Sequence, residues 1–503
     1  FNRDDSLQAR NFFAPANQPK PVLQQHQFGA VLGGPLVKNT LFAFGFYEGF
    51  RNKSGITQTL TVPTDAQRQG NFGSTTIRDP LTGLPFPGNT IPASRISPVS
   101  AKLLSEFMPT ANVGANRYTV SPTVQDDRDQ FGLRFDHRFN DRHSLLARYM
   151  FSQTERLTPR TVQPVDQVAT ARLQDVMGSH TFILKPNQIN VLRASFNRIY
   201  ANPAVTSGLK NSAYGIGFGN TNDLAVGLPS IVISGFPTLG DAQQPFVERV
   251  NNVLQIADDY TWLTGRHNIK FGVEFRQEFM KIAFINRPNG DITFNGSITG
   301  NAAADFLLGY ASQARATTTQ AIQEGTGKAW AGYIQDEFRL SSNITVNVGV
   351  RYEVTQPFID ENDAISGFST GTQSTKFPAA PRGLIYPGDP GVPRGIIPTD
   401  KNNFAPRISA VWDPTGTGKM SVRTSWGIFY DALAGQGDFF QSGVLAPPFT
   451  PLVEINSSAA SFDRITFANP LGTSGGSANP FPPNLTIIGW GQDFQTPYAM
   501  HYN

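Results

Sequence analysis

The stretch IKFGVEFRQEF at 269–279 decides the fold, because apolar and polar residues alternate along most of it. The same alternation recurs in ITVNVGVRYEV at 344–354 and in FGLRFDHRF at 131–139. A helix would spread these apolar residues around its axis, whereas a strand places alternate residues on opposite faces. The three stretches therefore predict β-strands with one apolar and one polar face.

Twelve such strands come in six pairs, and a short turn rich in Asn, Gly, Pro or Ser joins each pair. The predicted pairs are 23–36 with 41–51, 130–139 with 144–153, 176–184 with 188–200, 253–263 with 267–280, 329–340 with 344–354, and 404–412 with 420–430. Long connections separate the pairs, at 52–128, 156–174, 201–252, 281–328, 356–403 and 431–495. Helical turns are expected within them at Pro98–Met108 and Asn301–Leu308.

The composition agrees with many strands and irregular loops, since the chain has 39 Phe, 47 Gly and 37 Pro among 503 residues. Charged residues make up 16% and the net charge is +3, which does not indicate nucleic acid as a partner. The absence of cysteine excludes a disulfide scaffold and a thiolate metal site. No apolar run is long enough for a transmembrane helix.

The alternation of short turns with long loops predicts an all-β fold, a transmembrane antiparallel β-barrel of the bacterial outer membrane. Such barrels have short periplasmic turns and long extracellular loops. Strands of this length can cross a bilayer when tilted, and loops this long are uncommon in a compact soluble domain. A soluble β-sandwich or propeller is the alternative. Alternation alone does not exclude it, but loop asymmetry and strand length favour the barrel.

A barrel would turn the apolar face of each strand toward lipid and the polar face toward a wet lumen. The residues predicted to face the lumen, and so the candidates for substrate binding, are Arg134, Asp136, Arg138, Glu274, Arg276, Arg351 and Glu353. Aromatic residues near the strand ends are expected to form girdles at the membrane interfaces. They are Phe42, Phe44, Phe46, Tyr149, Phe151, Trp262, Trp330, Trp412 and Trp426.

Both ends of the sequence predict that residues 1–503 are only part of a barrel. An open sheet edge in lipid would leave backbone N–H and C=O groups without partners. Residues 1–10 are typical of a strand end that runs into a loop, and residues 495–503 of a loop that opens a new strand. We therefore expect strand material beyond both ends.

Ten phrases, spread in order over nearly the whole chain, resemble one known family. They are LQARNFF at 7–13, QFGAVLGGPL at 27–36, FGFYEGFR at 44–51, VPT at 62–64, QGNF at 69–72, IPASRISP at 91–98, YIQDEF at 333–338, VGVRYE at 348–353, NFAPR at 403–407 and GIFYD at 427–431. Together they are similar to the Oar-like TonB-dependent receptors that are abundant in Acidobacteria.

The resemblance implies a 22-stranded barrel filled by an N-terminal plug domain, often preceded by a carboxypeptidase-regulatory-like β-sandwich. Residues 1–503 would then hold strands 2–13, without the plug, the TonB box or the later strands. The implied function is import of a scarce, bulky substrate such as a glycan or metal chelate. The implied partners are outer-membrane lipid, the plug and the TonB–ExbB–ExbD complex. Surface adhesion or export through an Oar-like barrel, or a passive porin, are the alternatives.

The motifs that would indicate an enzyme or a cofactor are either incomplete or lie in the wrong structural context. Residues 415–420 lack the first Gly of a phosphate-binding loop, because position 413 is Asp. Residues 472–476 fit a nucleophile elbow but lie in a Gly-, Ser- and Pro-rich loop. The six histidines show no zinc pattern. Asp126, Asp127 and Asp129 lie where a long loop enters a strand, which indicates carboxylates that are exposed to solvent. A calcium site is the alternative. We expect no enzymatic activity, no cofactor and no metal.

Overall fold

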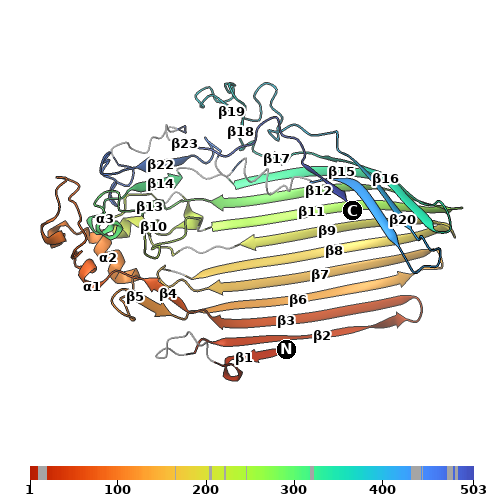
Figure 1. The fold of residues 1–503 in the computed structure, drawn as a ribbon, viewed down its shortest axis with the longest axis horizontal. Coiled ribbons are helices and arrows are strands. Elements are labelled where there is room, and N and C mark those ends of the chain that lie inside the picture. The colour runs from red at the N-terminus through yellow and green to blue at the C-terminus, as the bar shows by residue number, and fades with distance from the viewer. Residues whose placement is uncertain are drawn as a thin grey trace.

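The computed structural model of the protein describes residues 1–9, 20–164, 166–202, 207–219, 222–244, 246–317, 322–431, 443, 446–472, 480–481 and 485–503. Fifteen strands of this part form one antiparallel sheet (Figure 1). In spatial order they are β1 (Asn2–Asp4), β2 (Leu23–Val37), β3 (Leu41–Gly55), β6 (Thr123–Arg138), β7 (His143–Thr158), β8 (Gln167–Lys185), β9 (Gln188–Asn202), β11 (Phe246–Thr264), β12 (His267–Ile285), β15 (Ile322–Arg339), β16 (Ile344–Thr355), β20 (Phe404–Trp412), β21 (Val422–Tyr430) and β24 (Tyr498–Tyr502), with β17 (Ile359–Asp360) beside β15.

All twelve predicted strands are present, and each ends at its turn within two residues of the predicted position. At the loop side several predicted bounds are wrong, because the strands are longer. β6 begins at Thr123 instead of 130, β8 at Gln167 instead of 176, and β11 at Phe246 instead of 253. These extensions carry polar residues on both faces, so alternation gives no signal there. Backbone pairing with the neighbouring strand nevertheless continues.

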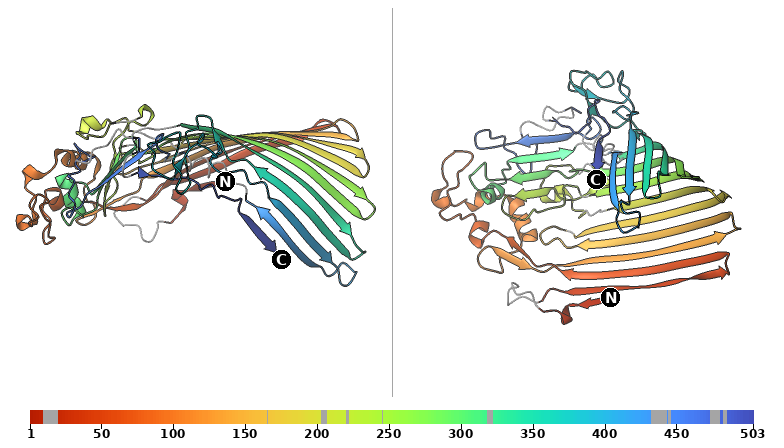
Figure 2. Two further views of the ribbon diagram at one scale, coloured as in Figure 1. Left: turned by 90° about the horizontal axis from the view of Figure 1, so that it is seen from above. Right: turned by 45° about the vertical axis from the view of Figure 1, so that its right-hand side comes forward.

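The large sheet curls about the direction of its strands (Figure 2). Its edges are β1, which pairs with β2, and β24, which pairs with β21. The prediction that residues 495–503 open a further strand is confirmed by β24. Short turns lie at one end of the long strands, and the long loops and helices lie at the other (Figure 1). We call these ends the turn side and the loop side.

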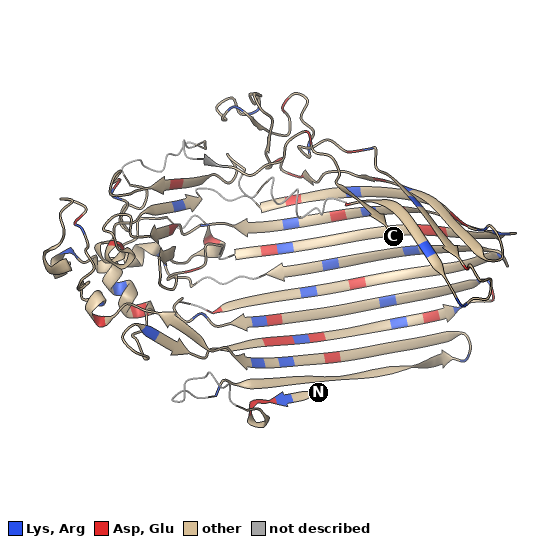
Figure 3. Ribbon diagram, in the orientation of Figure 1, with Lys and Arg blue, Asp and Glu red and all other residues tan. Residues whose placement is uncertain are grey.

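The two faces of the sheet differ in chemistry, because directly paired residues in neighbouring strands point to the same side. One register row joins Leu133, Tyr149, Val176 and Phe196 on β6, β7, β8 and β9. The apolar residues of this face are unusually open to solvent, and Val273 on β12 is 66% exposed. Charged residues recur along the long strands between β3 and β15 (Figure 3). The register places many of them on the opposite face, such as Arg134, Arg148 and Arg276. We call the two sides the apolar face and the polar face.

The long loops fold into a second layer at the loop side, which we call the cap. Its sheet contains β10 (Ser230–Ile233), β13 (Asp291–Phe294), β14 (Gln313–Thr317), β22 (Leu452–Asn456) and β23 (Leu485–Thr486). Around it lie α1 (Asp65–Arg68), α2 (Pro98–Phe107), α3 (Ala302–Leu308), and the pair β4 (Gln58–Thr61) and β5 (Arg117–Val120). A separate pair, β18 (Gly367–Phe368) and β19 (Leu384–Ile385), belongs to the loop at 356–403.

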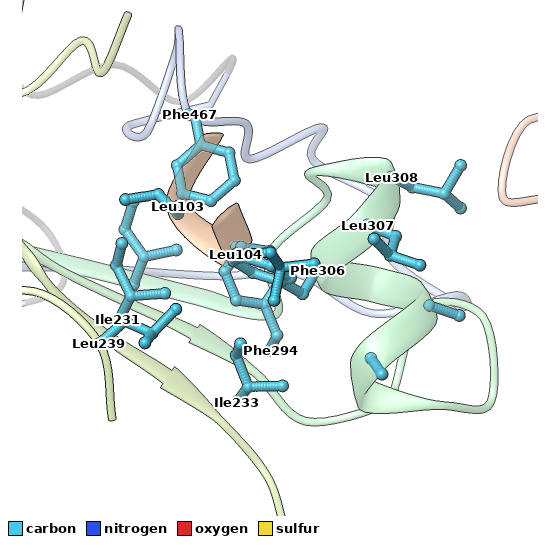
Figure 4. Close-up of a cluster of buried hydrophobic side chains, with 14 of the residues drawn as sticks. Leu103, Leu104, Ile231, Ile233, Leu239, Phe294, Phe306, Leu307, Leu308 and Phe467 are labelled. Carbon is cyan, nitrogen blue, oxygen red and sulfur yellow. The ribbon is translucent and has the colours of Figure 1, made fainter. Parts of the chain in front are cut away.

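One hydrophobic core holds the cap together, and five of the six long loops contribute to it. Leu103 and Leu104 from α2 meet Phe306 from α3, while Ile231 and Phe294 come from the cap sheet (Figure 4). Burial of large apolar side chains stabilises by about 1.5–3 kcal/mol each relative to exposure. These loops therefore form one packed module instead of independent segments.

Both predicted helical segments are confirmed. Pro98–Met108 contains α2, which begins with Pro98 after the N-cap Ser97. Asn301–Leu308 contains α3, whose N-cap Asn301 accepts hydrogen bonds from the backbone N–H groups of Ala303 and Ala304. Gly309 ends α3 with a positive φ of 75°, which favours glycine. No helix in the described residues is long and apolar enough to cross a membrane.

Candidate functional site

The polar face of the large sheet holds all seven charged residues that the sequence predicts for the lumen. Arg134 on β6 and Arg276 on β12 belong to one register row, which passes through Arg148, Met177, Ser195 and Gln255. Their neighbours at two-residue spacing, such as Asp136 and Glu274, project to the same side. The seven residues divide into two groups, since β7, β8, β9 and β11 lie between β6 and β12.

The group on β6 is neutralised locally. Arg134 binds Asp136 with its Nε and Nη2 atoms, both at 2.7 Å from a carboxylate oxygen. Arg138 pairs with Asp141 in the following turn at 2.7 Å. Each arginine thus already has a carboxylate partner within three residues of itself, so this group offers little free charge to a ligand.

The second group crosses three strands. Arg351 on β16 lies 3.0 Å from Glu353 on its own strand and 3.6 Å from Glu274 on β12. Ala331 on β15 separates Glu274 from Glu353 in the register, and its small side chain leaves room for this contact. Arg276 pairs with Glu278 on β12. The structure thus brings Glu274, Arg351 and Glu353 together.

A tyrosine that the sequence reasoning missed extends this network toward β9. The Tyr333 hydroxyl on β15 donates to Asp259 on β11 at 2.7 Å, crossing β12 above Gly272. A Cβ atom on Gly272 would lie 2.7 Å from the Tyr333 ring and 2.6 Å from the Asp259 carboxylate. Asp259 also pairs with Arg193 on β9 at 2.9 Å. The only sequence signal for this contact is a glycine among the polar positions of an alternating strand.

Beside this network, a hollow of about 540 Å³ lies along β15, β16, β20 and β21. Its lining includes Lys270 and Arg407, neither of which has an ion-pair partner among the residues that the structure describes. The Arg407 guanidinium lies 4.3 Å from the centre of the Phe429 ring, and that ring meets His501 edge-on. Sequence reasoning missed both cations as candidates. The hollow therefore combines free positive charge with amide, hydroxyl and aromatic groups, which suits an anionic or polar ligand.

An apolar area lies at the other end of the polar face, on β2 and β3. Phe42 and Phe44 pair with Asp136 and Arg134, so they share a face with these charged residues. The prediction that Phe42, Phe44 and Phe46 form a lipid girdle is therefore wrong. The cause is the register between β3 and β6, which turns Ala43 and Gly45, and not the three phenylalanines, to the apolar face. The other predicted girdle residues, including Trp330 opposite Phe275, lie on the apolar face.

The remaining sequence candidates do not form a site in the described residues. Asp129 accepts hydrogen bonds from Arg51 and Tyr47, and Asp127 accepts one from Gln125. No group of three potential metal ligands gathers in the described part of the chain. Residues 415–420 lie in the turn between β20 and β21, where Asp413 accepts from the backbone N–H groups of Thr415 and Gly418. The nucleophile-elbow pattern lies outside the described residues, apart from Gly472.

A curled antiparallel sheet with an exposed apolar face and a charged opposite face defines the wall of a membrane-spanning β-barrel. The comparisons with known proteins agree, since a family model described as outer membrane beta barrel domain matches residues 1–503. The chain belongs to this family, and its place is the bacterial outer membrane. The apolar face is thus the outer, lipid-facing side, and the polar face is the inner, lumenal side.

Several solved structures align with this chain at low identity. The outer membrane transporter YddB from Escherichia coli aligns with a TM-score of 0.48 and 11% identity, over 95% of this chain and 43% of YddB. The siderophore receptor PirA from Acinetobacter baumannii gives 0.39 and 9%, over 82% of this chain and 41% of PirA. The ferric-catecholate import receptor Fiu from Escherichia coli gives 0.39 and 11%, over 82% and 51%. This chain thus spans about half or less of these proteins, and no curated protein matches it.

Proposed function

We propose that the protein is an Oar-like, TonB-dependent outer-membrane receptor that imports a scarce, bulky substrate, such as a glycan or a metal chelate. In this proposal residues 1–503 supply barrel strands 2–13 of 22. A plug domain elsewhere in the protein fills the lumen, and the TonB–ExbB–ExbD complex drives transport. The cap would capture the substrate, and displacement of the plug would admit it.

The observation that carries the proposal is the apolar area on the lumenal face of β2 and β3. Phe42 and Phe44 are 42% and 45% exposed, and a hollow of about 560 Å³ lies against this area and includes Val31 and Phe46 in its lining. A water-filled pore would leave these side chains in contact with solvent, at a cost of about 25 cal/mol per Å² of apolar area. A plug domain packed against them would remove that area from water. This supports a plugged receptor over a passive porin.

At the opposite end of the lumenal face, Lys270 and Arg407 supply positive charge that no carboxylate of the described residues neutralises. An acidic group of the substrate or of the plug would complete these ion pairs. The candidates Arg134, Asp136 and Arg138 are neutralised by local pairs. The β12 and β16 group, with Glu274, Arg276, Arg351 and Glu353, lies beside the two free cations. We assign substrate or plug contact to this second region.

The test is uptake by a strain that lacks the gene, supplied with a panel of glycans and metal chelates. Import of one compound class should disappear on deletion, return with the wild-type gene, and disappear again when TonB is inactivated. An Arg407→Gln variant should lower that uptake several-fold, whereas Arg142→Gln in the exposed β6–β7 turn should not. Uptake that persists without TonB would contradict the receptor and favour a porin.

Surface adhesion or export is the second candidate, and the packed cap favours it, because an ordered module on the cell surface can hold another macromolecule. The same deletion strain distinguishes the two functions. Loss of attachment or of secreted protein, with unchanged uptake of every compound in the panel, would support adhesion or export and exclude nutrient import.

A further inference from the structure

The lipid-facing side of the sheet changes from apolar to charged about ten residues from the turns. On β9, Leu192 and Phe196 are exposed apolar residues of this side, and Arg198 lies ten residues from the turn end at Gln188. A tilted strand of that length covers the roughly 25 Å apolar band of an outer-membrane barrel. Outward-facing residues at similar distances on other strands are also polar, namely Arg51, Asp129, Gln153 and Lys328. These residues form a collar at the level of the outer-leaflet headgroups.

Two arginines lie next to each other in this collar, on β8 and β9. Arg172 is paired with Tyr200, and Arg198 is paired with Gln174, so the two arginines are diagonal neighbours on one face. Diagonal neighbours in an antiparallel pair have Cα atoms about 7–8 Å apart, within the reach of two long side chains directed at one group.

Neither guanidinium has a carboxylate partner among the described residues. Arg172 donates to the neutral Gln153 amide oxygen at 2.8 and 3.1 Å, and its guanidinium lies 5.8 Å from the Phe151 ring centre. Arg198 makes one long contact of 3.4 Å with the Asn252 amide oxygen. Two other cations of the collar are paired, Arg51 with Asp129 and Lys281 with Glu324, whereas Lys328 lies apart from the two arginines on β15. The two arginines thus form a local concentration of unneutralised positive charge.

The surface beside Arg198 is hollowed rather than flat. A groove of about 420 Å³ runs across β9, β11, β12 and β15, and Arg198, Tyr200 and Asn252 line its β9 end. Three carboxylates line this groove. Glu324 pairs with Lys281, the Tyr200 hydroxyl donates to Glu248 at 3.5 Å, and Glu361 lies beside Glu324, to whose carbonyl its backbone N–H donates. The β9 end therefore offers cationic and neutral donor groups next to the apolar band.

We propose that Arg172 and Arg198 form a binding site for a phosphate group in the headgroup of an outer-leaflet lipid. Guanidinium groups bind phosphate oxygens with two parallel N–H donors, and two of them can hold one phosphate from both sides. The acyl chains of the lipid would lie along the apolar residues below, such as Val176 and Phe196. The position favours a lipid over a soluble anion, because the site faces the bilayer at headgroup depth.

The test uses the full-length protein, purified from outer membranes in detergent, and measures binding of diphosphorylated lipid A by native mass spectrometry. The wild type should retain this lipid, and the Arg172→Gln/Arg198→Gln variant should bind it at least tenfold more weakly. The matched control is Arg128→Gln/Arg156→Gln, which removes two arginines at similar distances from their turns on the lumenal face. This control should bind as the wild type does.

Three further outcomes decide the proposal. Dephosphorylated lipid A should bind the wild type weakly, and millimolar inorganic phosphate should not displace the intact lipid. Equal binding of the dephosphorylated lipid, equal loss in both double variants, or displacement by inorganic phosphate would each overturn the proposal. Heat-modified migration on gels shows that each variant forms a folded barrel, and a variant that fails this check is replaced by the single Arg198→Gln substitution, for which the same lipid comparison applies.

Discussion

Gly272 shows how a single residue organises the lumenal face. Tyr333 and Asp259 meet over this glycine, and their contact links β15 to β11 across β12. Alternation over 269–279 predicted that Gly272 takes the polar face, but the contact depends on register between strands that are distant in the sequence. For the same reason the sequence indicated Arg351 as lumenal without indicating that it meets Glu274.

Substitution of Gly272 by alanine should destabilise the barrel. The added methyl group would overlap Tyr333 and Asp259, and such overpacking costs about 1–3 kcal/mol. The expected result is a lower temperature of unfolding for the full-length protein in detergent micelles. Gly178→Ala on β8 is the matched control, because no neighbouring side chain or strand lies within 4 Å of the place that its methyl group would take. Equal unfolding temperatures for both variants would show that the crossing contact is absent.

The ion pair of Asp79 and Arg95 predicts a pH response in the cap. Both guanidinium Nη atoms lie 3.0 Å from the Asp79 carboxylate oxygens, and this bonding lowers the pKa of Asp79 below its ordinary value. The ion pair therefore stabilises the folded cap at pH values above the ordinary pKa of an aspartate. This stabilisation is lost as the pH falls through the lowered pKa of Asp79. The amide-exchange protection of the Leu81 N–H, which donates to Asp79, should decrease as the pH falls below about 4. In Asp79→Asn this decrease should be absent, and an identical decrease would contradict the assignment.

The strands illustrate what local pattern can and cannot determine. Alternation over 344–354 predicted β16 to within one residue, because one face of each strand is uniformly apolar. On β3 the same rule failed, since both faces are compatible with lipid: Phe42 and Phe44 on one, Ala43 and Gly45 on the other. Only pairing with β6 places Phe44 beside Arg134. The core of the cap was not predictable, because its contacts join distant loops, as when Ser100 on α2 donates to the Phe306 carbonyl on α3.

The start of α3 depends on one buried carboxylate. Asp305 is fully buried and accepts hydrogen bonds from the backbone N–H groups of Gly296 and Thr299 and from the Thr299 hydroxyl. Burial raises the pKa of Asp305 even though these bonds oppose the shift. The carboxyl group fixes the turn at 296–299 against the first turn of the helix.

Asp305→Ala should loosen this part of the cap, because each buried N–H left without an acceptor costs about 1–3 kcal/mol. Proteases added to intact cells should then cut near 296–305 much faster than in the wild type, while the barrel remains folded. Asp223→Ala, at an exposed cap position, should leave the cleavage rate unchanged. Equal resistance of both variants would contradict the structural role of Asp305.

Across the whole molecule, the two ends of the sheet face different environments. The turn side carries short connections such as 265–266, whereas the loop side carries the cap with its own core. A barrel in the outer membrane places its short turns in the periplasm and its long loops outside the cell. This orientation also places the collar in the outer leaflet. It opens the lumen, with Lys270 and Arg407, toward the cap on one side and toward the periplasm on the other. The proposed import and the proposed lipid site both require it.

The most direct test of the barrel and its orientation is labelling of single introduced cysteines on intact cells, since residues 1–503 contain no cysteine of their own. Leu81→Cys and Asn362→Cys lie in exposed loop positions, while Lys38→Cys and Thr415→Cys lie in exposed turns. A maleimide that cannot cross the outer membrane should label the first two on intact cells, and the last two only after the outer membrane is opened. Labelling of the turns but not of the loops on intact cells, or of all four equally, would contradict the account.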